Sequence, residues 1–250
     1  PAGQTLPLAS EEGREVGVAE AEDDDADDAP AAEGGTLRLG IIETLETPDP
    51  QRARTIQQGI YANMITDTLV HFDDQSEIQP KVAESWESSE DGLTHTFSIR
   101  EGMLFHDGEP VDAEAVRFSF ERVLDEDFDT SMRDPIPSIT DVTVIDDYTV
   151  EFKIPQPSAL MVPHITGNSL GIVSPTAVED MGEDFPDNPV GSGPFKFVSF
   201  VPDQEVVLER FDDYWAGAPI LDQVIIRTIA EDSTRLLEFE NGSLEVAYGV

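Results

Sequence analysis

Residues 188–219 read NPVGSGPFKFVSFVPDQEVVLERFDDYWAGAP and decide how the rest of the sequence is interpreted. The stretch opens on a glycine-rich turn, continues through two runs typical of strands, and closes on an aromatic cluster. Glycine permits sharp turns and close backbone approach, so GSG at 191–193 predicts a tight return of the chain into a sheet. In the closing DDYWAGAP we expect Tyr214 and Trp215 to bury their rings as a packing element.

Strand and helix patterns alternate on both sides of this stretch. Alternating or short apolar runs predict strands at 36–42, 93–100, 204–210, 222–229 and 244–250, and a hairpin over 142–154 with its turn at Asp146-Asp147. Helices are predicted at 55–70, where Ile56, Ile60, Met64 and Leu69 recur near helical spacing, at 111–124 with Asp112 as N-cap, and at 231–243, ending near Gly242. Interleaved helices and strands with hairpins favour an α/β fold with a mixed sheet.

The net negative charge of the chain excludes two classes of binding partner. The chain carries 53 Asp and Glu against 14 Lys and Arg, a formal net charge of -39. This charge repels nucleic acid and anionic lipid headgroups, so neither is expected as a partner. Self-repulsion of this size destabilises a compact state unless salt screens it, which predicts a protein adapted to concentrated salt. No apolar run reaches the roughly 18 residues of a membrane-spanning helix.

Residues 1–33 differ in composition from the rest. They include eleven acidic residues, one arginine and no aromatic residue. Such a segment cannot bury enough apolar area to offset the entropy of ordering, so we predict a disordered acidic tether. Pro1 is not an initiator methionine, so a secretion signal or a lipid-anchored residue upstream is compatible with the sequence.

Motifs for covalent chemistry or metal binding are weak. The chain has no cysteine, which excludes disulfides, zinc-thiolate sites and iron-sulfur clusters, and its four histidines lack metal-ligand spacing. Ser192 lies in GSG without the Gly-x-Ser-x-Gly elbow of a hydrolase, and neither a P-loop nor Gly-x-Gly-x-x-Gly occurs. We therefore expect no enzyme, no metal and no cofactor. Asn241 begins an NGS sequon, and whether it is glycosylated stays open.

Four ordered blocks carry a resemblance to a known family. They are GGTLRLG, the run from LVHFDDQSEIQPKVAESW through FHDGEPVDAEAVRFSFERV, NPVGSGPFKFVSF, and FDDYWAGAPILDQVIIRTIAEDSTRLLEFENGSLEVA. In this order they resemble the family 5 extracellular solute-binding proteins, the dipeptide, oligopeptide and nickel receptors of ABC importers. The likeness extends from Gly34 to Val250, and the charge makes the sequence similar to a haloarchaeal member.

The resemblance implies an architecture. Family members have two lobes that close on a ligand and run to roughly twice this length. The expected fold is a type II periplasmic-binding-protein-like lobe, with a mixed core sheet at about 34–70 and 188–250 and an inserted α+β subdomain at about 71–187. The chain is expected to hold the first lobe, with the second lobe absent.

Candidate ligand contacts follow from strand ends and from the resemblance. Sites in open α/β sheets form beyond the carboxyl ends of strands, which selects Glu43, Thr44 and Leu45. The resemblance adds Tyr61, His164 and Asn168, together with the loop of Gly191, Ser192 and Gly193. The alternatives are a solvated carboxylate for Glu43, a core aromatic for Tyr61 and a purely structural turn for 191–193.

The resemblance also implies a function. We expect a monomeric receptor, tethered at the cell surface outside the membrane, that captures peptides or similar small solutes and delivers them to the permease of an ABC importer. A nickel chelate, a sugar or an opine remains open as the solute. An acidic hydrolase on a similar scaffold and a sensory ligand-binding module are the alternatives from other classes.

Overall fold

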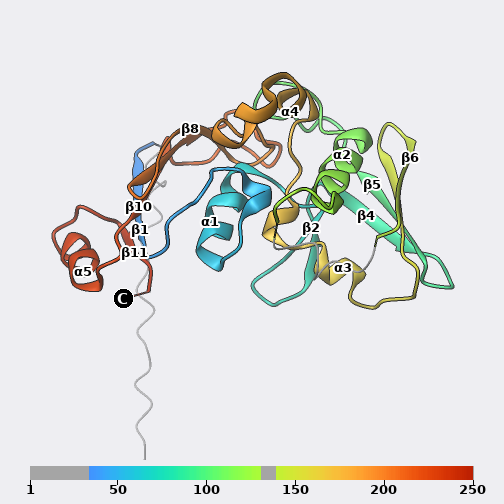
Figure 1. Cartoon of the computed structure of the whole chain (residues 1–250), viewed down its shortest axis with the longest axis horizontal. Coiled ribbons are helices and arrows are strands. Elements are labelled where there is room, and N and C mark those ends of the chain that lie inside the picture. Colours follow the sequence, from blue (N-terminus) through green and yellow to red (C-terminus); the bar gives the residue numbers. More distant parts are fainter. Residues whose placement is uncertain (1–33, 131–138, 250) are drawn as a thin grey trace, which may run out of the picture. The chain divides into compact units, whose positions relative to one another are not determined.

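A computed structural model describes residues 34–130 and 139–249 (Figure 1). Within these residues the larger sheet has five strands in the order β11-β1-β10-β9-β8. They are β1 (Thr36–Ile41), β8 (Phe195–Val201), β9 (Glu205–Arg210), β10 (Gln223–Thr228) and β11 (Val246–Ala247). β1 pairs in parallel with β10 and β11, whereas β9 pairs antiparallel with β10 and β8. The predicted mixed sheet is therefore confirmed.

The helix α1 (Ile56–Ile65) packs against the buried face of this sheet. Alternate residues of the strands, such as Leu39, Ile41, Leu208 and Ile226, are buried because successive strand side chains point to opposite faces. Tyr61 and Ile65 of α1 belong to the same buried cluster. Another helix, α5 (Asp232–Glu240), leads into β11.

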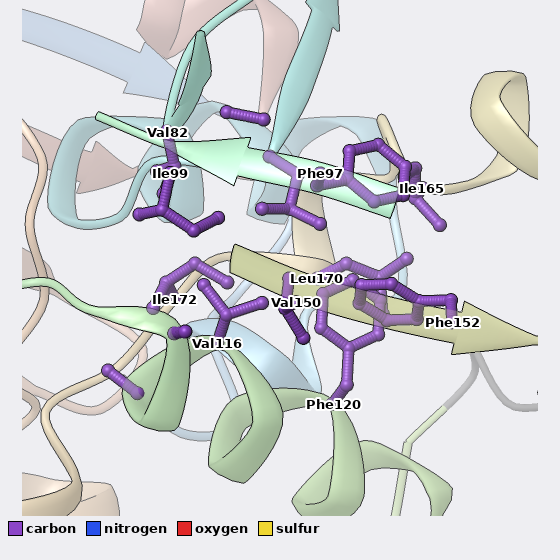
Figure 2. Packing of buried hydrophobic residues seen from close by; sticks show 14 of the residues in the cluster. Val82, Phe97, Ile99, Val116, Phe120, Val150, Phe152, Ile165, Leu170 and Ile172 are labelled. Atoms are coloured by element: carbon purple, nitrogen blue, oxygen red, sulfur yellow. The ribbon is translucent and has the colours of Figure 1, made fainter. Parts of the chain in front are cut away.

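The second sheet is antiparallel and carries the larger core. Its order is β4-β5-β7-β6, with β4 (Ala83–Ser88), β5 (Thr94–Ile99), β6 (Asp141–Asp146) and β7 (Thr149–Lys153). The helix α2 (Ala113–Leu124) packs on β6 and β7 (Figure 1). Figure 2 shows Phe120 reaching from α2 toward Phe152, and the Phe152 ring in turn meets that of Phe97 edge to face, with centroids 5.4 Å apart.

Short elements connect the sheets. A small hairpin of β2 (Val70–Phe72) and β3 (Ile78–Pro80) follows α1. The remaining helical segments are η1 (Pro50–Arg52), α3 (Met161–His164), η2 (Asn168–Leu170), α4 (Pro175–Met181) and η3 (Gly182–Asp187). These segments have few turns and little periodicity, which explains why the sequence patterns did not predict them.

Most predicted elements are confirmed, with shifts at their ends. Asp112 caps α2 as expected, its carboxylate accepting from Ala115 N at 2.8 Å. The hairpin turn lies one residue later than predicted, at Asp147-Tyr148, because β6 extends through Asp146. The first helix ends at Ile65 rather than near residue 70, since Thr66 is already extended.

All strands of the four-stranded sheet lie, in the sequence, between the first and second strands of the five-stranded sheet. β1 precedes all strands of the four-stranded sheet, and β8 to β11 follow them. The described residues nevertheless form one compact unit, so the division into a core at 34–70 and 188–250 and an inserted subdomain at 71–187 stays a prediction. The predicted tether at 1–33 lies outside the described residues. Among the described helices, none has both the length and the apolar content to span a bilayer.

Candidate ligand-facing site

The loop after β1 lies at the carboxyl ends of parallel strands and is held by two glutamines of α1. Gln57 Oε1 accepts from the backbone N–H groups of Ile42 and Glu43, at 2.9 and 3.0 Å. Gln58 donates Nε2 to Thr44 O at 3.1 Å, and its Oε1 accepts from Arg54 N at 2.7 Å. Both glutamines are buried, so their amides satisfy loop groups that no strand partner reaches.

The loop encloses a hollow of about 200 Å³, which we call the loop hollow. Its polar lining comprises Glu46, Thr47, Asp49, Arg52, Arg54, Gln58 and Asp129, and Leu45, Ala53 and Tyr61 contribute apolar surface. The Arg52 and Arg54 side chains are 34% and 42% exposed, so part of each side chain reaches solvent at the rim. Arg54 pairs with the largely exposed Asp129 at 2.5 Å. The rim therefore offers both signs of charge to a polar solute.

A buried ion pair fixes the inner wall of the loop hollow. Asp49 is fully buried, and its Oδ2 lies 2.6 Å from Arg122 Nη2. Arg122 also donates to Gln51 Oε1 at 2.6 Å, and its guanidinium stacks over the Phe128 ring at 4.3 Å. Because the arginine comes from α2, this pair joins the loop to the second sheet's helix and limits its motion.

Arg52 is less completely paired than its neighbour. Its Nε lies 3.5 Å from Asp49 Oδ2, and this buried donor has no hydrogen-bond partner within the described residues. Its guanidinium rests 5.0 Å from the Phe128 centroid.

Of the nine predicted contacts, four gather at this loop. Leu45 and Tyr61 line the loop hollow, and Glu43 and Thr44 precede it in the chain. Glu43 Oε2 is buried without a hydrogen-bond partner among described residues, and Thr44 donates to Asp203 Oδ1 at 2.8 Å. Tyr61 is fully buried and donates to Pro48 O at 2.6 Å; burial, then the nearby Asp49 charge, raise its pKa well above the usual value. Its hydroxyl is not exposed, so contact with a ligand stays a prediction.

The other predicted contacts lie elsewhere. His164 ends α3, and its Nδ1 is buried without a hydrogen-bond partner in the described part of the chain. Asn168 begins η2 and borders a different hollow. Gly191, Ser192 and Gly193 are buried, and the structure places them between α1 and the turn that contains His106. Their part in ligand contact also stays a prediction.

These three residues and their partners form what we call the glycine junction: His106, Asp67, Gly191, Ser192 and Gly193. Gly191 N donates to His106 Nδ1 at 3.3 Å, and His106 Nε2 lies 2.9 Å from Gly193 O, so the ring proton is on Nε2. Burial lowers the pKa of His106 to about 4, which keeps the ring neutral. A Cβ on Gly193 would lie 2.5 Å from Ile65 C, so close backbone approach requires glycine there.

Asp67 is the residue of this junction that sequence reasoning missed. Its carboxylate is fully buried and accepts from Tyr214 Oη at 3.1 Å and Trp215 Nε1 at 2.9 Å, with Lys81 Nζ 2.9 Å away. Its backbone N–H donates to Ser192 Oγ at 3.2 Å. The polar ends of two aromatic residues in DDYW indicate that a buried acceptor is needed, but nothing near Asp67 marks it as that acceptor.

The described residues do not hold a cluster of three or more His, Asp or Glu side chains able to bind a metal ion. What the loop hollow offers is a wall joined to α2 by the Asp49–Arg122 pair and lined by charged groups of both signs. Such a surface can recognise a polar solute without covalent chemistry.

Comparison with known proteins identifies the family of the chain. Residues 77–250 match the model of the bacterial extracellular solute-binding proteins, family 5 Middle. The glutathione-binding protein GsiB of Pectobacterium atrosepticum is 28% identical over 221 residues, which cover 88% of this chain and 43% of that protein. Relatives of this kind are binding proteins rather than enzymes.

Solved structures have the same fold. The periplasmic binding protein DppA from Helicobacter pylori, in complex with the peptide STSA, superposes with a TM-score of 0.79 at 30% identity, over 85% of this chain and 46% of that one. The oligopeptide-binding protein AppA from Bacillus subtilis, in complex with a nonapeptide, gives 0.77 at 26% identity, over 85% and 43%. The chain thus spans less than half the length of these relatives. With the family model matched over most of its length, the chain belongs to the family 5 bacterial extracellular solute-binding proteins.

Proposed function

We propose that this chain provides one wall of the cleft of an extracellular receptor, which captures peptides or similar small solutes and delivers them to an ABC importer. The observation that carries the proposal is the braced loop at the carboxyl ends of β1 and β10, with its charged hollow, in a member of this family. Relatives described as binding glutathione or crystallised with peptides support a peptide as the solute.

The solute would lie against the rim of the loop hollow. Arg52 and Arg54 donate to its carboxylate or carbonyl groups, and Glu46 and Asp129 accept from its amino groups. Glu43, Thr44 and Leu45 of the same loop contact the solute beside them. A second lobe closes over the solute, which stabilises the closed form by its greater affinity for that form. The permease then recognises the closed receptor.

We also propose that the chain forms the first lobe of the receptor. Residues 1–33 connect this lobe to a lipid anchor at the cell surface. The receptor works as a monomer in concentrated salt, as a haloarchaeal protein would. The charge of -39 supports the salt adaptation. We expect the chain to lose its cooperative thermal transition when potassium chloride is lowered from molar to millimolar concentration, measured by circular dichroism. A transition unchanged in dilute buffer would contradict salt adaptation and leave the receptor proposal intact.

The function is tested by identifying what the protein carries. The receptor containing this chain would be purified from its native cells in high salt, and the small molecules released on denaturation would be identified by mass spectrometry. Short peptides are the expected result. Recovery of another solute would support a receptor function but contradict a peptide as the solute. An empty protein that hydrolyses peptides would overturn the proposal.

The site is tested with a matched pair of arginines. The substitution Arg54→Gln removes a charged hydrogen-bond donor at the rim. It should weaken binding of the recovered solute by about tenfold, measured by calorimetry. Arg117→Gln is the control, because Arg117 is 37% exposed, as Arg54 is 42%, and pairs with Glu114 and Glu121 on α2. Equal affinities of the two variants for the solute would show that the solute does not bind at the loop hollow.

A further inference from the structure

Asn241 begins a modification motif that the proposed function does not use. The sequence Asn241-Gly242-Ser243 has the Asn-x-Ser pattern of an acceptor for N-glycosylation. The chain contains this pattern once, because none of its other three asparagines has Ser or Thr two residues later. A pattern this short also occurs by chance, so the geometry around Asn241 has to decide whether the side chain can be modified.

The motif lies in the turn between α5 and β11. The helix ends at Glu240, and Asn241 is its C-cap residue. Gly242 has a φ of +77°, a conformation that favours glycine where a helix stops. All three residues of the motif are exposed. The end of the helix therefore presents the motif at the surface of the described part of the chain.

The side-chain amide of Asn241 is bonded at its oxygen and free at its nitrogen. Its Oδ1 accepts from Ser243 Oγ at 2.6 Å and from Ser243 N at 3.0 Å, which is an Asx-turn. Its Nδ2 has no hydrogen-bond partner among the described residues. The serine hydroxyl of the motif thus already contacts the amide, and the nitrogen to which a saccharide would be joined is accessible.

The same turn opposes a competing reaction of Asn-Gly pairs. In deamidation, the backbone nitrogen of the glycine attacks the side-chain carbonyl carbon of the asparagine. Here Gly242 N donates to Phe239 O at 3.1 Å, and Ser243 N donates to Glu238 O at 2.8 Å. Because these bonds hold the backbone against the last turn of α5, Gly242 N is not free to attack, and the Asn241 amide is retained.

The turn lies at the opposite edge of the five-stranded sheet from the loop hollow. β11 pairs in parallel with β1, so the residues that precede β11 lie toward the beginning of β1. Glu245, just before β11, donates its N–H to Arg38 O at 3.0 Å, and its carboxylate pairs with the Arg38 side chain at 3.2 Å. The loop that encloses the loop hollow follows the other end of β1. A group attached to Asn241 would therefore leave the proposed solute site open.

We propose that Asn241 is an N-glycosylation site that receives a saccharide from a lipid-linked saccharide phosphate. A membrane-bound glycosyltransferase that acts outside the cytoplasm catalyses the transfer. Nδ2 forms a bond to the anomeric carbon of the saccharide while the bond from that carbon to the phosphate oxygen breaks. The electron pair of the broken bond stays on the phosphate, and one amide proton passes to a base of the transferase. Ser243 positions the amide through its hydroxyl.

This modification goes beyond the proposed function. It requires the chain to be outside the cytoplasm, as in an extracellular solute-binding family, and it is independent of the solute and of the loop hollow.

The first test uses the receptor that contains this chain, purified from its native cells and digested to peptides. Mass spectrometry of the peptide that contains Asn241 should show the added mass of a saccharide, with sugar fragment ions and the attachment at Asn241. A peptide found only in its unmodified or deamidated form would overturn the proposal.

Two substitutions of Ser243, expressed in the same cells, separate the motif from the fold. Ser243→Thr keeps the hydroxyl and should keep the saccharide, whereas Ser243→Ala should abolish it although Asn241 is unchanged. Ser243→Ala shortens one exposed side chain, so its thermal unfolding in molar potassium chloride should remain cooperative.

Asn63→Gln is the matched control, because Asn63 is exposed but has Ile65 two residues later. This variant should carry the same saccharide as the original chain. A saccharide retained at Asn241 in Ser243→Ala, or lost in Ser243→Thr, would overturn the assignment of the motif.

Discussion

The glycine junction and the loop hollow differ in how completely their polar groups are paired. At the junction, Asp67 accepts from two aromatic side chains and lies beside a lysine, and both ring nitrogens of His106 have backbone partners. At the loop hollow, Arg52 Nε is buried without a hydrogen-bond partner among described residues, as is Glu43 Oε2 earlier in the same loop. The junction is thus saturated and the hollow is not.

This difference separates structural motifs from groups available to a solute. GSG and DDYW are conspicuous in the sequence because close packing needs glycine and aromatic residues, and the structure uses both of them in the junction. The loop hollow is lined mostly by ordinary charged and polar residues, and among them Arg52 Nε is buried without a hydrogen-bond partner within the described residues. The motif at 191–193 is thus fully used by close packing, which is the structural alternative that the sequence left open for these residues.

The largest effect is expected from Asp67→Asn, which breaks the centre of the junction. The variant leaves Lys81 without its buried counter-charge, and the neutral amide has only one oxygen to accept from Tyr214 and Trp215. Loss of one partner of a buried pair costs about 4 kcal/mol. Urea unfolding at constant molar salt, followed by tryptophan fluorescence, measures this change.

Asp141→Asn is the control for that variant, because Asp141 pairs with Lys153 at an exposed site. No measurable loss of stability is expected there, since exposed pairs contribute little. If the two variants were equally stable, the Asp67 network would not be a support of the fold.

A somewhat smaller loss is expected from Gly193→Ala. The added Cβ would meet the backbone of Ile65 and Met64 at 2.5 and 2.6 Å, and backbone cannot move aside as a flexible side chain can. Overpacking of this kind costs about 3 kcal/mol. The same urea titration reports the value.

Gly102→Ala separates crowding from backbone conformation. Gly102 has a φ of +79°, and a Cβ there would have no atom within 4 Å, so only the conformational cost of about 1 kcal/mol is expected. An equal loss in both variants would contradict the close approach at Gly193.

Local patterns predicted most elements of the fold and part of the candidate site. Strand alternation fixed β1, β9 and β10, and the strand-end rule selected Glu43 to Leu45. The helical spacing of Ile56, Ile60 and Met64 did not mark the buried face of α1: Ile56 is 75% exposed, whereas Gln57 and Gln58 are buried. These glutamines face inward because their amides bond the loop, and no apolar pattern records such a bond.

Long-range pairs account for the rest of what was missed. Asp49 and Arg122 are 73 residues apart, and Tyr214 is 147 residues from Asp67. In a sequence with 53 acidic residues, no sequence pattern distinguishes an Asp or Glu that is buried in the fold from one that is exposed to solvent. Only the folded arrangement distinguishes them.

The pH dependence of stability sharpens the comparison through His106. Its pKa in the folded state is about 4, below the ordinary value of 6.5, so unfolding takes up a proton between these values. The stabilisation from the neutral ring is complete above about pH 6.5 and shrinks as the pH falls toward 4, by about 3 kcal/mol at the lower end.

His106→Gln removes this titration and retains an amide donor toward Gly193 O. The difference in unfolding free energy between the original chain and the variant, measured in urea from neutral pH to pH 4, should narrow as the pH falls. A difference that stays constant would show that the ring is not held neutral by burial.

The smallest effect is expected from Gln57→Ala, which removes a brace of the loop that encloses the loop hollow. The variant leaves the N–H groups of Ile42 and Glu43 without their acceptor, at a cost of about 1 to 2 kcal/mol. Because the loop is only partly paired, this loss should stay local: amide exchange of Ile42 and Glu43 should accelerate about tenfold while that of Leu39 in β1 is unchanged. Gln79→Ala, on the β2-β3 hairpin, should leave all three rates unchanged. Acceleration of Leu39 as well would mean that the loop and the sheet open together, and the loop would then belong to the rigid scaffold as the glycine junction does.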